Sequence, residues 1–199
     1  MRRLIRVHGP CALVAEKRRS PFEALVSAVA HQQLHGRAAE TILGRFRALF
    51  APARFPSARR LADVSDEELR GCGFSRAKTA AIRDIAEKTL SGVVPTSRAI
   101  ARMSDEEIIA RLTAVRGVGR WTVEMLLIFK LGRPDVLPVD DFGVRNGLRI
   151  AFALPEMPSP KEVLAFGERW RPHATTAAWY LWRAADAAQK RKAIAGVNG

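Results

Sequence analysis

The sequence predicts an all-α fold, and three observations lead to that prediction. Four segments carry a serine followed three residues later by a glutamate, the capping box that opens a helix: Ser20, Ser65, Ser104 and Ser159. Apolar residues then recur every three or four positions, as in 22–29, which is the spacing of one helical face. No segment of useful length alternates between apolar and polar residues as a half-buried strand would. Residues 4–7 could be extended, but an isolated strand would have no partner.

Serine and proline mark most of the helix starts. Pro21 and Pro160 follow capping serines, and proline suits the first helical position because the amide it lacks would be unpaired there. Ser75 can cap a further helix. In order, the expected helices are 21–35, 37–50, 66–71, 76–90, 105–114, one through 121–128, 142–152, one opening at 160, and 174–190.

Glycine and proline mark the helix ends, because glycine tolerates the left-handed backbone of a C-terminal cap and proline cannot continue a helix. They stand at 36, 52, 56, 92, 132, 134 and 138. The proline-bearing segments 52–57 and 91–96 could divide two lobes. The tail 196–199 is expected to be frayed.

The charge favours nucleic acid as the partner. The 199 residues carry a formal net charge of +13, and 26 of the 33 basic residues are arginine. Arginine donates two hydrogen bonds at once to a phosphate, and a strongly basic chain is attracted to polyanions at long range. A genome rich in G and C also raises the arginine content, so the charge by itself only favours this class of partner.

Composition also excludes several classes. No apolar run approaches the roughly 18–20 residues of a membrane span, and 125–129 is the longest candidate. No long apolar stretch follows the basic N-terminus, so a secretory signal is not expected. Cys11 and Cys72 can form neither a disulfide framework nor a four-thiolate cluster. We expect a soluble, intracellular protein without a membrane partner.

A Gly-x-Gly turn separates two of the predicted helices. Gly117 and Gly119 allow a tight turn and a close approach of the backbone to another surface. The turn also precedes a helix N-terminus, where unpaired amides and the positive helix end form an anion site. A bare Gly-x-Gly more often serves only as a connection between helices, but here a second feature follows it.

That feature is the pair Asp140–Asp141, at the start of the helix predicted from 142. Either aspartate alone would be explained as a helix cap. Two adjacent aspartates allow one to cap while the other faces a cavity. A carboxylate near DNA can stabilise positive charge that develops on a sugar when its base departs.

The turn with the aspartate that follows it resembles the helix-hairpin-helix DNA glycosylase superfamily, and within it the 3-methyladenine DNA glycosylase II (AlkA-like) branch. Segments 31–39, 69–78 and 168–172 are similar to further motifs of that branch. The resemblance covers roughly residues 20–188. It implies one two-lobed helical domain over 1–199, with the helix-hairpin-helix at 105–131 and a cleft for DNA and the base between the lobes. The branch's additional N-terminal β lobe would be absent.

By this resemblance the protein is a monofunctional base excision repair enzyme. It would bind double-stranded DNA from the minor-groove side as a monomer and rotate the damaged nucleotide out of the stack. It would hydrolyse the N-glycosidic bond of alkylated purines such as 3-methyladenine and 7-methylguanine, leaving an abasic site. We expect a cytoplasmic protein, at the nucleoid when it acts on DNA.

The resemblance assigns catalysis to Asp141, with Asp140 as the alternative and as the expected helix cap. Strand-cleaving relatives carry a lysine two residues after the second glycine, which forms a Schiff base. Trp121 stands there instead, so water would be the nucleophile. The base pocket would contain Trp121, Met125 and His173, and the last two depart from the aromatic residues of the branch.

The DNA contacts implied by the resemblance lie in two segments. Gln33 or Leu34 would fill the gap left by the extruded base, although Leu34 could equally be a buried residue at a helix end. The backbone or side chains of the hairpin would bind phosphates, through Arg116, Gly117, Val118, Gly119, Arg120 and Thr122.

No cofactor is required by the expected chemistry, and an iron–sulfur cluster is not expected. The resemblance implies a structural monovalent cation, Na⁺ or K⁺, on the backbone carbonyls of Thr113, Val115 and Val118. Trp179 and Trp182 lie three apart on one helical face and are expected in the core.

Two alternatives remain at this stage. The chain could be a non-catalytic helix-hairpin-helix protein that only binds DNA, using the same hairpin and the same charge. It could also be a glycosylase for another class of lesion.

Overall fold

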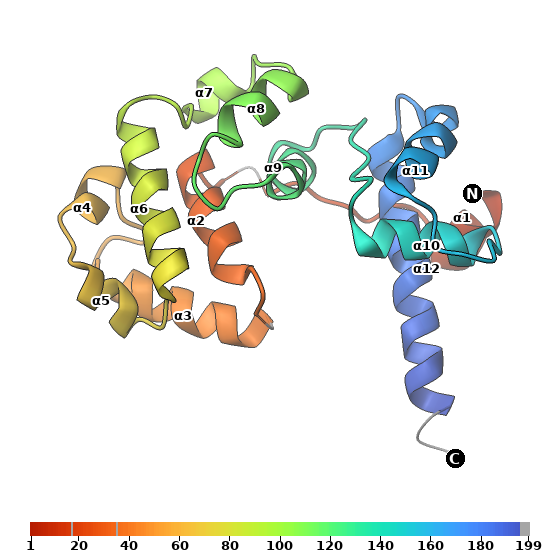
Figure 1. Ribbon diagram of the computed structural model, residues 1–199, viewed down its shortest axis with the longest axis horizontal. Coiled ribbons are helices and arrows are strands. Elements are labelled where there is room, and N and C mark those ends of the chain that lie inside the picture. The colour runs from red at the N-terminus through yellow and green to blue at the C-terminus, as the bar shows by residue number, and fades with distance from the viewer. Residues whose placement is uncertain (17, 35, 196–199) are drawn as a thin grey trace. The chain divides into compact units, whose positions relative to one another are not determined.

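The computed structural model describes residues 1–16, 18–34 and 36–195, and every regular element in these ranges is a helix (Figure 1). The predicted all-α fold is therefore confirmed. The tail 196–199 and His35 of the 31–39 motif lie outside the described residues. None of the described helices has the length and apolar character needed to cross a membrane.

The chain forms two compact units. One contains residues 16–126 and is called the hairpin unit. The other contains the first 15 residues together with the chain from Leu127 onward, and is called the aspartate unit. The expectation that segments 52–57 and 91–96 divide lobes is wrong, because both lie inside the hairpin unit. They are turns between helices that share one core, since α4 and α5 both pack on α6.

The hairpin unit is built around α6, against which α2, α4 and α5 pack. Four phenylalanines fill part of the core, with Phe46 in contact with Phe50, Phe55 and Phe74 at ring-centroid distances of 5.2–5.7 Å. The helices, in order, are α2 (Pro21–His31), α3 (Gly36–Ala48), α4 (Ala58–Ala62), α5 (Asp66–Gly71), α6 (Arg76–Leu90), α7 (Ser97–Ile100), α8 (Asp105–Leu112) and α9 (Arg120–Leu126).

The aspartate unit has its core between α10 and α12. The fully buried side chains there are Val144, Leu148, Val163, Ala178 and Leu181. Its elements are α1 (Arg2–His8), the π-helix η1 (Leu127–Leu131), α10 (Phe142–Ala151), α11 (Pro160–Gly167), the 3₁₀ turn η2 (Glu168–Trp170) and α12 (Ala174–Ala195).

Close packing of α10 on α12 depends on two glycines four residues apart on one face of α10. A Cβ at Gly147 would collide with the backbone of Leu181, and one at Gly143 would lie 2.7 Å from the Trp182 ring. Any side chain at either position would push the helices apart.

The N-terminal segment 4–7, which could have been extended but would then have had no partner strand, is helical. A helix satisfies its own backbone hydrogen bonds, whereas an isolated strand cannot. Leu4 packs on the core of the aspartate unit, and the Tyr180 hydroxyl donates to the carbonyl of Gly9 at 2.8 Å just after α1 ends.

The helix starts follow the caps that the sequence predicts. Complete capping boxes occur at Ser65, Ser104 and Ser159, whereas the Ser20 hydroxyl accepts only the amide of Glu23. Besides α1, the short α-helices α4 and α7 of the described part of the chain were not predicted. Each follows a hydroxyl residue, Ser57 or Thr96, that accepts the amide three positions later.

The hairpin between α8 and α9 needs glycine at Gly117. Its φ is +75°, and an added Cβ would lie 3.1 Å from the Cβ of Ala81. Gly119 has no such requirement, since an added Cβ there meets no atom within 4 Å. Gly117 therefore fixes the turn, and Gly119 leaves its outer surface open.

We expect Glu107→Ala to destabilise the protein at neutral pH and to lose this effect in acid. Hydrogen bonds from the backbone and side chain of Ser104 lower the pKa of Glu107 below its ordinary value of 4.5. A lowered pKa in the folded state adds stability above pH 4.5, which disappears as the pH falls through the lowered pKa. Thermal melting between pH 3 and pH 7 measures the difference. Glu67→Ala, at a carboxylate outside the capping boxes, is the control and should show less pH dependence.

Gly117→Ala should lower the free energy of unfolding by about 1–2 kcal/mol, because alanine is strained at positive φ. The matched change Gly119→Ala should cost about 0.5 kcal/mol or less. Urea unfolding of both variants measures the two values. Equal losses at the two positions would contradict this account of the hairpin.

Candidate active site and DNA-contact hairpin

Side chains from two other helices hold the hairpin. The carboxylate of Asp84, on α6, accepts the backbone amide of Arg116 at 2.7 Å. The side-chain amide of Gln32, which follows α2, donates to the carbonyl of Gly117 at 3.0 Å and lies 3.5 Å from the hydroxyl of Thr122. The hairpin is therefore braced, because hydrogen bonds from Asp84 and Gln32 fix its backbone.

The predicted phosphate-contact residues of the hairpin fall into two groups. The side chains of Val118 and Thr122 are buried, so only their backbone groups can reach a phosphate. Gly117, Gly119 and the Arg116 side chain are exposed. The first amides of a helix lack partners within the helix, so the start of α9 offers donors to an anion.

Arg120 is already engaged by two carboxylates. Its guanidinium lies 3.2 Å from Glu106 and 3.1 Å from the buried Glu124. Desolvation lowers the pKa of Arg120, but the hydrogen bonds and charges of these two carboxylates outweigh it and raise the pKa. This arginine therefore braces α8 against α9, in addition to any contact with DNA.

The three residues expected to offer carbonyls to a monovalent cation lie in one shallow depression. Thr113, Val115 and Val118 line it, together with Asp84 and Lys88 of α6. Among the described residues, no group of three or more His, Cys, Asp or Glu side chains could hold a metal ion.

Residues 32–34 form a turn that we call the wedge turn. Gln33 is exposed and has a left-handed backbone, with φ +56°. Leu34 is 40% exposed, so the alternative that it is a buried helix-end residue is wrong. Both candidates for filling the gap in DNA therefore project from the surface of the hairpin unit.

Asp141 is the N-cap of α10. Its Oδ1 accepts the amide of Val144 at 2.8 Å and the indole N–H of Trp182, also at 2.8 Å. The expectation that Asp140 would be the cap is wrong. The cap is the residue directly before the first helical residue, which is Phe142, so Asp140 stands one position too early and is exposed.

Trp182 is the site residue that the sequence reasoning missed. It was expected in the core, but it is only partly buried and its N–H holds Asp141. Its ring stacks on Phe129, with centroids 5.6 Å apart and planes 23° from parallel. A tryptophan N–H needs a partner when its ring is buried, yet the sequence does not say which acceptor folds next to it.

Trp179 and Trp170 are packing residues. Trp179 contacts Tyr180 edge-on at 4.9 Å, and Trp170 joins a cluster with Phe152 and Phe166.

The predicted base-pocket residues are divided between the two units. Trp121 and Met125 lie four residues apart on one face of α9 in the hairpin unit, and Trp121 is 45% exposed. His173 is exposed just before α12 in the aspartate unit. Phe142, directly after Asp141, is 69% exposed and adds an aromatic surface that was not predicted.

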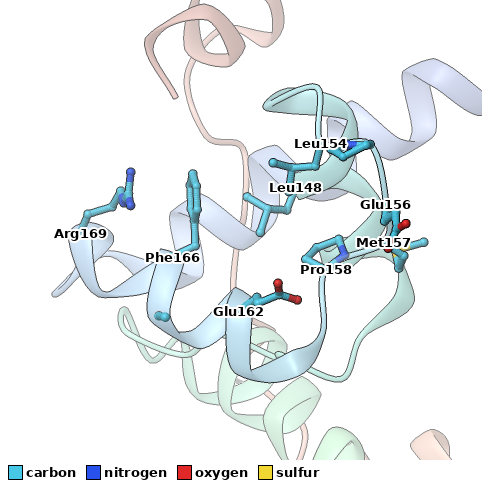
Figure 2. Close-up of a pocket in the computed structure, with 10 residues that line it drawn as sticks. Leu148, Leu154, Glu156, Met157, Pro158, Glu162, Phe166 and Arg169 are labelled. Carbon is cyan, nitrogen blue, oxygen red and sulfur yellow. The ribbon is translucent and has the colours of Figure 1, made fainter.

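A separate apolar cavity of about 550 Å³ lies in the aspartate unit (Figure 2). Leu148, Met157 and Phe166 line it, and the guanidinium of Arg169 lies 3.9 Å from the centre of the Phe166 ring. No predicted site residue lines this cavity, so it is distinct from the site at Asp141.

Comparison with known proteins agrees with this geometry. DNA-3-methyladenine glycosylase 1 of Schizosaccharomyces pombe is 45% identical over 178 residues, covering 89% of this chain and 78% of that protein. The solved structure of the Schizosaccharomyces pombe 3-methyladenine DNA glycosylase Mag1 in complex with abasic DNA matches with a TM-score of 0.83 and 44% identity, over 92% of this chain and 89% of that one.

A DNA-3-methyladenine glycosidase from Bacillus halodurans matches with a TM-score of 0.82 and 36% identity, over 92% of this chain and 82% of that one. The family described as HhH-GPD superfamily base excision DNA repair protein matches residues 26–172. With its all-helical fold, its braced hairpin and its aspartate at the start of α10, this chain belongs to the HhH-GPD superfamily of base excision DNA repair proteins.

Proposed function

We propose that this protein is a monofunctional DNA glycosylase that releases alkylated purines, of the 3-methyladenine and 7-methylguanine type, from double-stranded DNA. The observation that carries the proposal is the carboxylate of Asp141, held at Oδ1 by the Val144 amide and the Trp182 indole. The names of the similar proteins support the substrate class, since those from Schizosaccharomyces pombe and Bacillus halodurans are a 3-methyladenine glycosylase and a 3-methyladenine glycosidase.

The chemistry asked of Asp141 is electrostatic. As the bond between C1′ and the base nitrogen breaks, the base leaves with the electron pair and the sugar becomes positively charged. A carboxylate fixed in advance stabilises that charge without reorganising during the reaction. Water then adds to C1′ and loses a proton, which leaves an abasic site.

The substrate class follows from the leaving group. A purine alkylated at N3 or N7 carries positive charge and departs without protonation by a strong general acid. The exposed ring of Trp121 can attract such a cation through its electron-rich face. We infer that Trp121 and Met125 contact the base, and the resemblance also assigns a base contact to His173.

The absence of strand cleavage is also part of the proposal. Formation of a Schiff base with the sugar needs an amine, and the position two residues after Gly119 holds Trp121. We therefore expect no covalent complex with DNA when borohydride is added. A trapped complex would indicate a bifunctional enzyme.

We further infer a monomer that binds the minor-groove side of DNA and acts in the cytoplasm, at the nucleoid when on DNA. We also infer a Na⁺ or K⁺ ion on the carbonyls of Thr113, Val115 and Val118, which line one depression with Asp84 and Lys88, where the ion would bridge the hairpin and a phosphate. That ion would have a structural role, and we expect neither a catalytic cofactor nor an iron–sulfur cluster.

Asp141→Asn should reduce the release of 3-methyladenine and 7-methylguanine from methylated duplex DNA at least about 100-fold, because it removes the stabilising charge. Asparagine is an equally good N-cap, so α10 should remain folded. DNA binding should be kept or improved, because a negative charge near phosphate is lost. Chromatography of the free bases measures release, and fluorescence anisotropy measures binding.

Asp140→Asn is the matched control for this variant and should release bases as the wild type does. Equal release by the wild type and Asp141→Asn would overturn the assignment. No release by the wild type, with DNA binding retained, would favour a non-catalytic binder or a glycosylase for another lesion.

Trp182→Phe should slow base release about 10–100-fold while leaving the fold intact. The change keeps an aromatic ring against Phe129 but removes a hydrogen bond to a charged group, which is worth about 1.5–3 kcal/mol. Single-turnover excision measures the rate. The control is Trp179→Phe, on the same helix but packed against Tyr180. If Trp182→Phe and Trp179→Phe lost the same amount of rate, the positioning of Asp141 by Trp182 would be contradicted.

A further inference from the structure

A lysine from α6 reaches the end of α2. Lys78 is the third residue of α6, and its backbone amide donates to the capping hydroxyl of Ser75 at 3.3 Å. Its ammonium donates to the carbonyl of Ala30 at 2.8 Å and to the carbonyl of Gln32 at 2.7 Å. These two carbonyls lie on either side of His31, the last residue of α2, and the second belongs to Gln32, the first residue of the wedge turn.

The two carbonyls belong to the group that a helix end leaves without partners inside the helix. Two neighbouring carbonyls are bonded by backbone amides of the turn: Gln32 N donates to Val29 O and Leu34 N donates to His31 O, each at 3.3 Å. The carbonyls of Ala30 and Gln32 receive their hydrogen bonds from Lys78. A cation also suits the negative end of the α2 dipole.

The ammonium is partly withdrawn from water. Desolvation lowers the pKa of Lys78, which accords with a side chain directed into the protein toward α2. Hydrogen bonds in such surroundings are stronger than in water. The two carbonyls therefore engage Lys78 inside the hairpin unit.

The turn that Lys78 holds has an uncommon backbone. Gln33 is a non-glycine residue at φ +56°, a conformation that persists only where neighbouring contacts enforce it. The Lys78 bond to Gln32 O fixes the peptide unit directly before Gln33. That bond is placed to keep Gln33 and Leu34 projecting.

Gln32 is held at both ends. Its carbonyl accepts from Lys78, and its side-chain amide donates to Gly117 O in the hairpin. The wedge turn and the hairpin are therefore linked through one residue, and Lys78 secures that residue from the α6 side.

We infer that Lys78 is a positioning residue for base extrusion: it holds the wedge turn in the conformation that inserts into DNA, in register with the phosphate-binding hairpin. This inference rests on the proposed function, because it assumes that the wedge turn replaces an extruded base. It assigns Lys78 no contact with the sugar or the base.

The test is Lys78→Met, which keeps an unbranched side chain of nearly the same length and removes the donors. The substrates are two duplexes that carry one 7-methylguanine, opposite cytosine or opposite an abasic-site analogue. The second target is unpaired, so its extrusion is easier and depends less on the wedge. We expect single-turnover release from the paired duplex to fall at least about tenfold, the deficit on the unpaired duplex to be less than about threefold, and the Kd for DNA to change less than about threefold.

Lys161→Met is the matched control, because it removes an exposed lysine from α11, outside both DNA-contact segments. It should behave as the wild type. Lys78→Arg keeps charge and donors and should recover most of the rate on the paired duplex. If melting shows that Lys78→Met is not folded, Lys78→Gln, which keeps one amide donor, replaces it with the same expected difference between the two duplexes.

Equal deficits on the paired and unpaired duplexes would show a general structural effect and overturn the inference. A loss in Kd alone would also overturn it, since Lys78 would then act as a DNA contact. A wild-type rate in Lys78→Met would do the same.

A second measurement separates this inference from the proposed function. A 2-aminopurine beside the target base brightens when the stack opens, whether or not a base is released. If the wild type opens the stack without releasing 7-methylguanine, the proposed function fails. A smaller fluorescence rise in Lys78→Met would then still support the inference, and an unchanged rise would overturn it.

Discussion

One carboxylate oxygen, Oδ1 of Asp141, connects the helix that begins at the site to the long helix behind it. It accepts two hydrogen bonds, one from the backbone amide of Val144 in the first turn of α10 and one from the indole N–H of Trp182 on α12. The bond from Trp182 requires α10 and α12 to lie close together, and Gly143 and Gly147 make that approach possible. The cap, the helix packing and the orientation of the carboxylate are therefore a single arrangement. A change to any part of it would move the Asp141 carboxylate, to which we assign the stabilisation of the sugar.

The hairpin unit uses the same principle with different groups. The hairpin and the wedge turn, which we propose contact DNA, are short loops. Polar side chains from other segments of the unit fix their backbones. Asp84 holds the amide of Arg116, Gln32 holds the carbonyl of Gly117, and Lys78 holds the wedge turn. Each bond leaves the outer surface of its loop open to a ligand. Fixed backbone donors of this kind can bind a phosphate with little loss of conformational freedom.

Many of the arginines that give the chain its charge also have structural partners. Arg83 donates to carbonyls at the end of α4 and to Asp66, and Arg111 donates to the carbonyls of Gly92 and Val93. These guanidinium groups close helix ends as Lys78 does, yet their positive charge still contributes to the long-range field. The net charge thus attracts DNA, while Arg83 and Arg111, which contribute to it, are also held by protein partners.

The sequence determined the all-α fold and the position of most helices, because caps and glycine stops are local signals. The start of α6 after Ser75 and the three complete capping boxes depend only on residues three positions apart. It also predicts the segments of the proposed site, namely the turn at Gly117, the aspartate pair and residues 31–39. Short helices such as α1 and α4 escaped prediction because tertiary packing stabilises them more than their own sequence does.

Only the tertiary structure decided which groups meet. Trp182 lies 41 residues from Asp141, and Lys78 lies 46 residues from Gln32, so no local pattern relates either pair. Asp141 rather than Asp140 is the cap because α10 begins at Phe142, so only Asp141 stands directly before the first helical residue. Exposure of Leu34 was decided by how the end of α2 is held. A hydrogen bond depends on distance and direction in space, and for residues far apart in the chain these are set only when the helices pack.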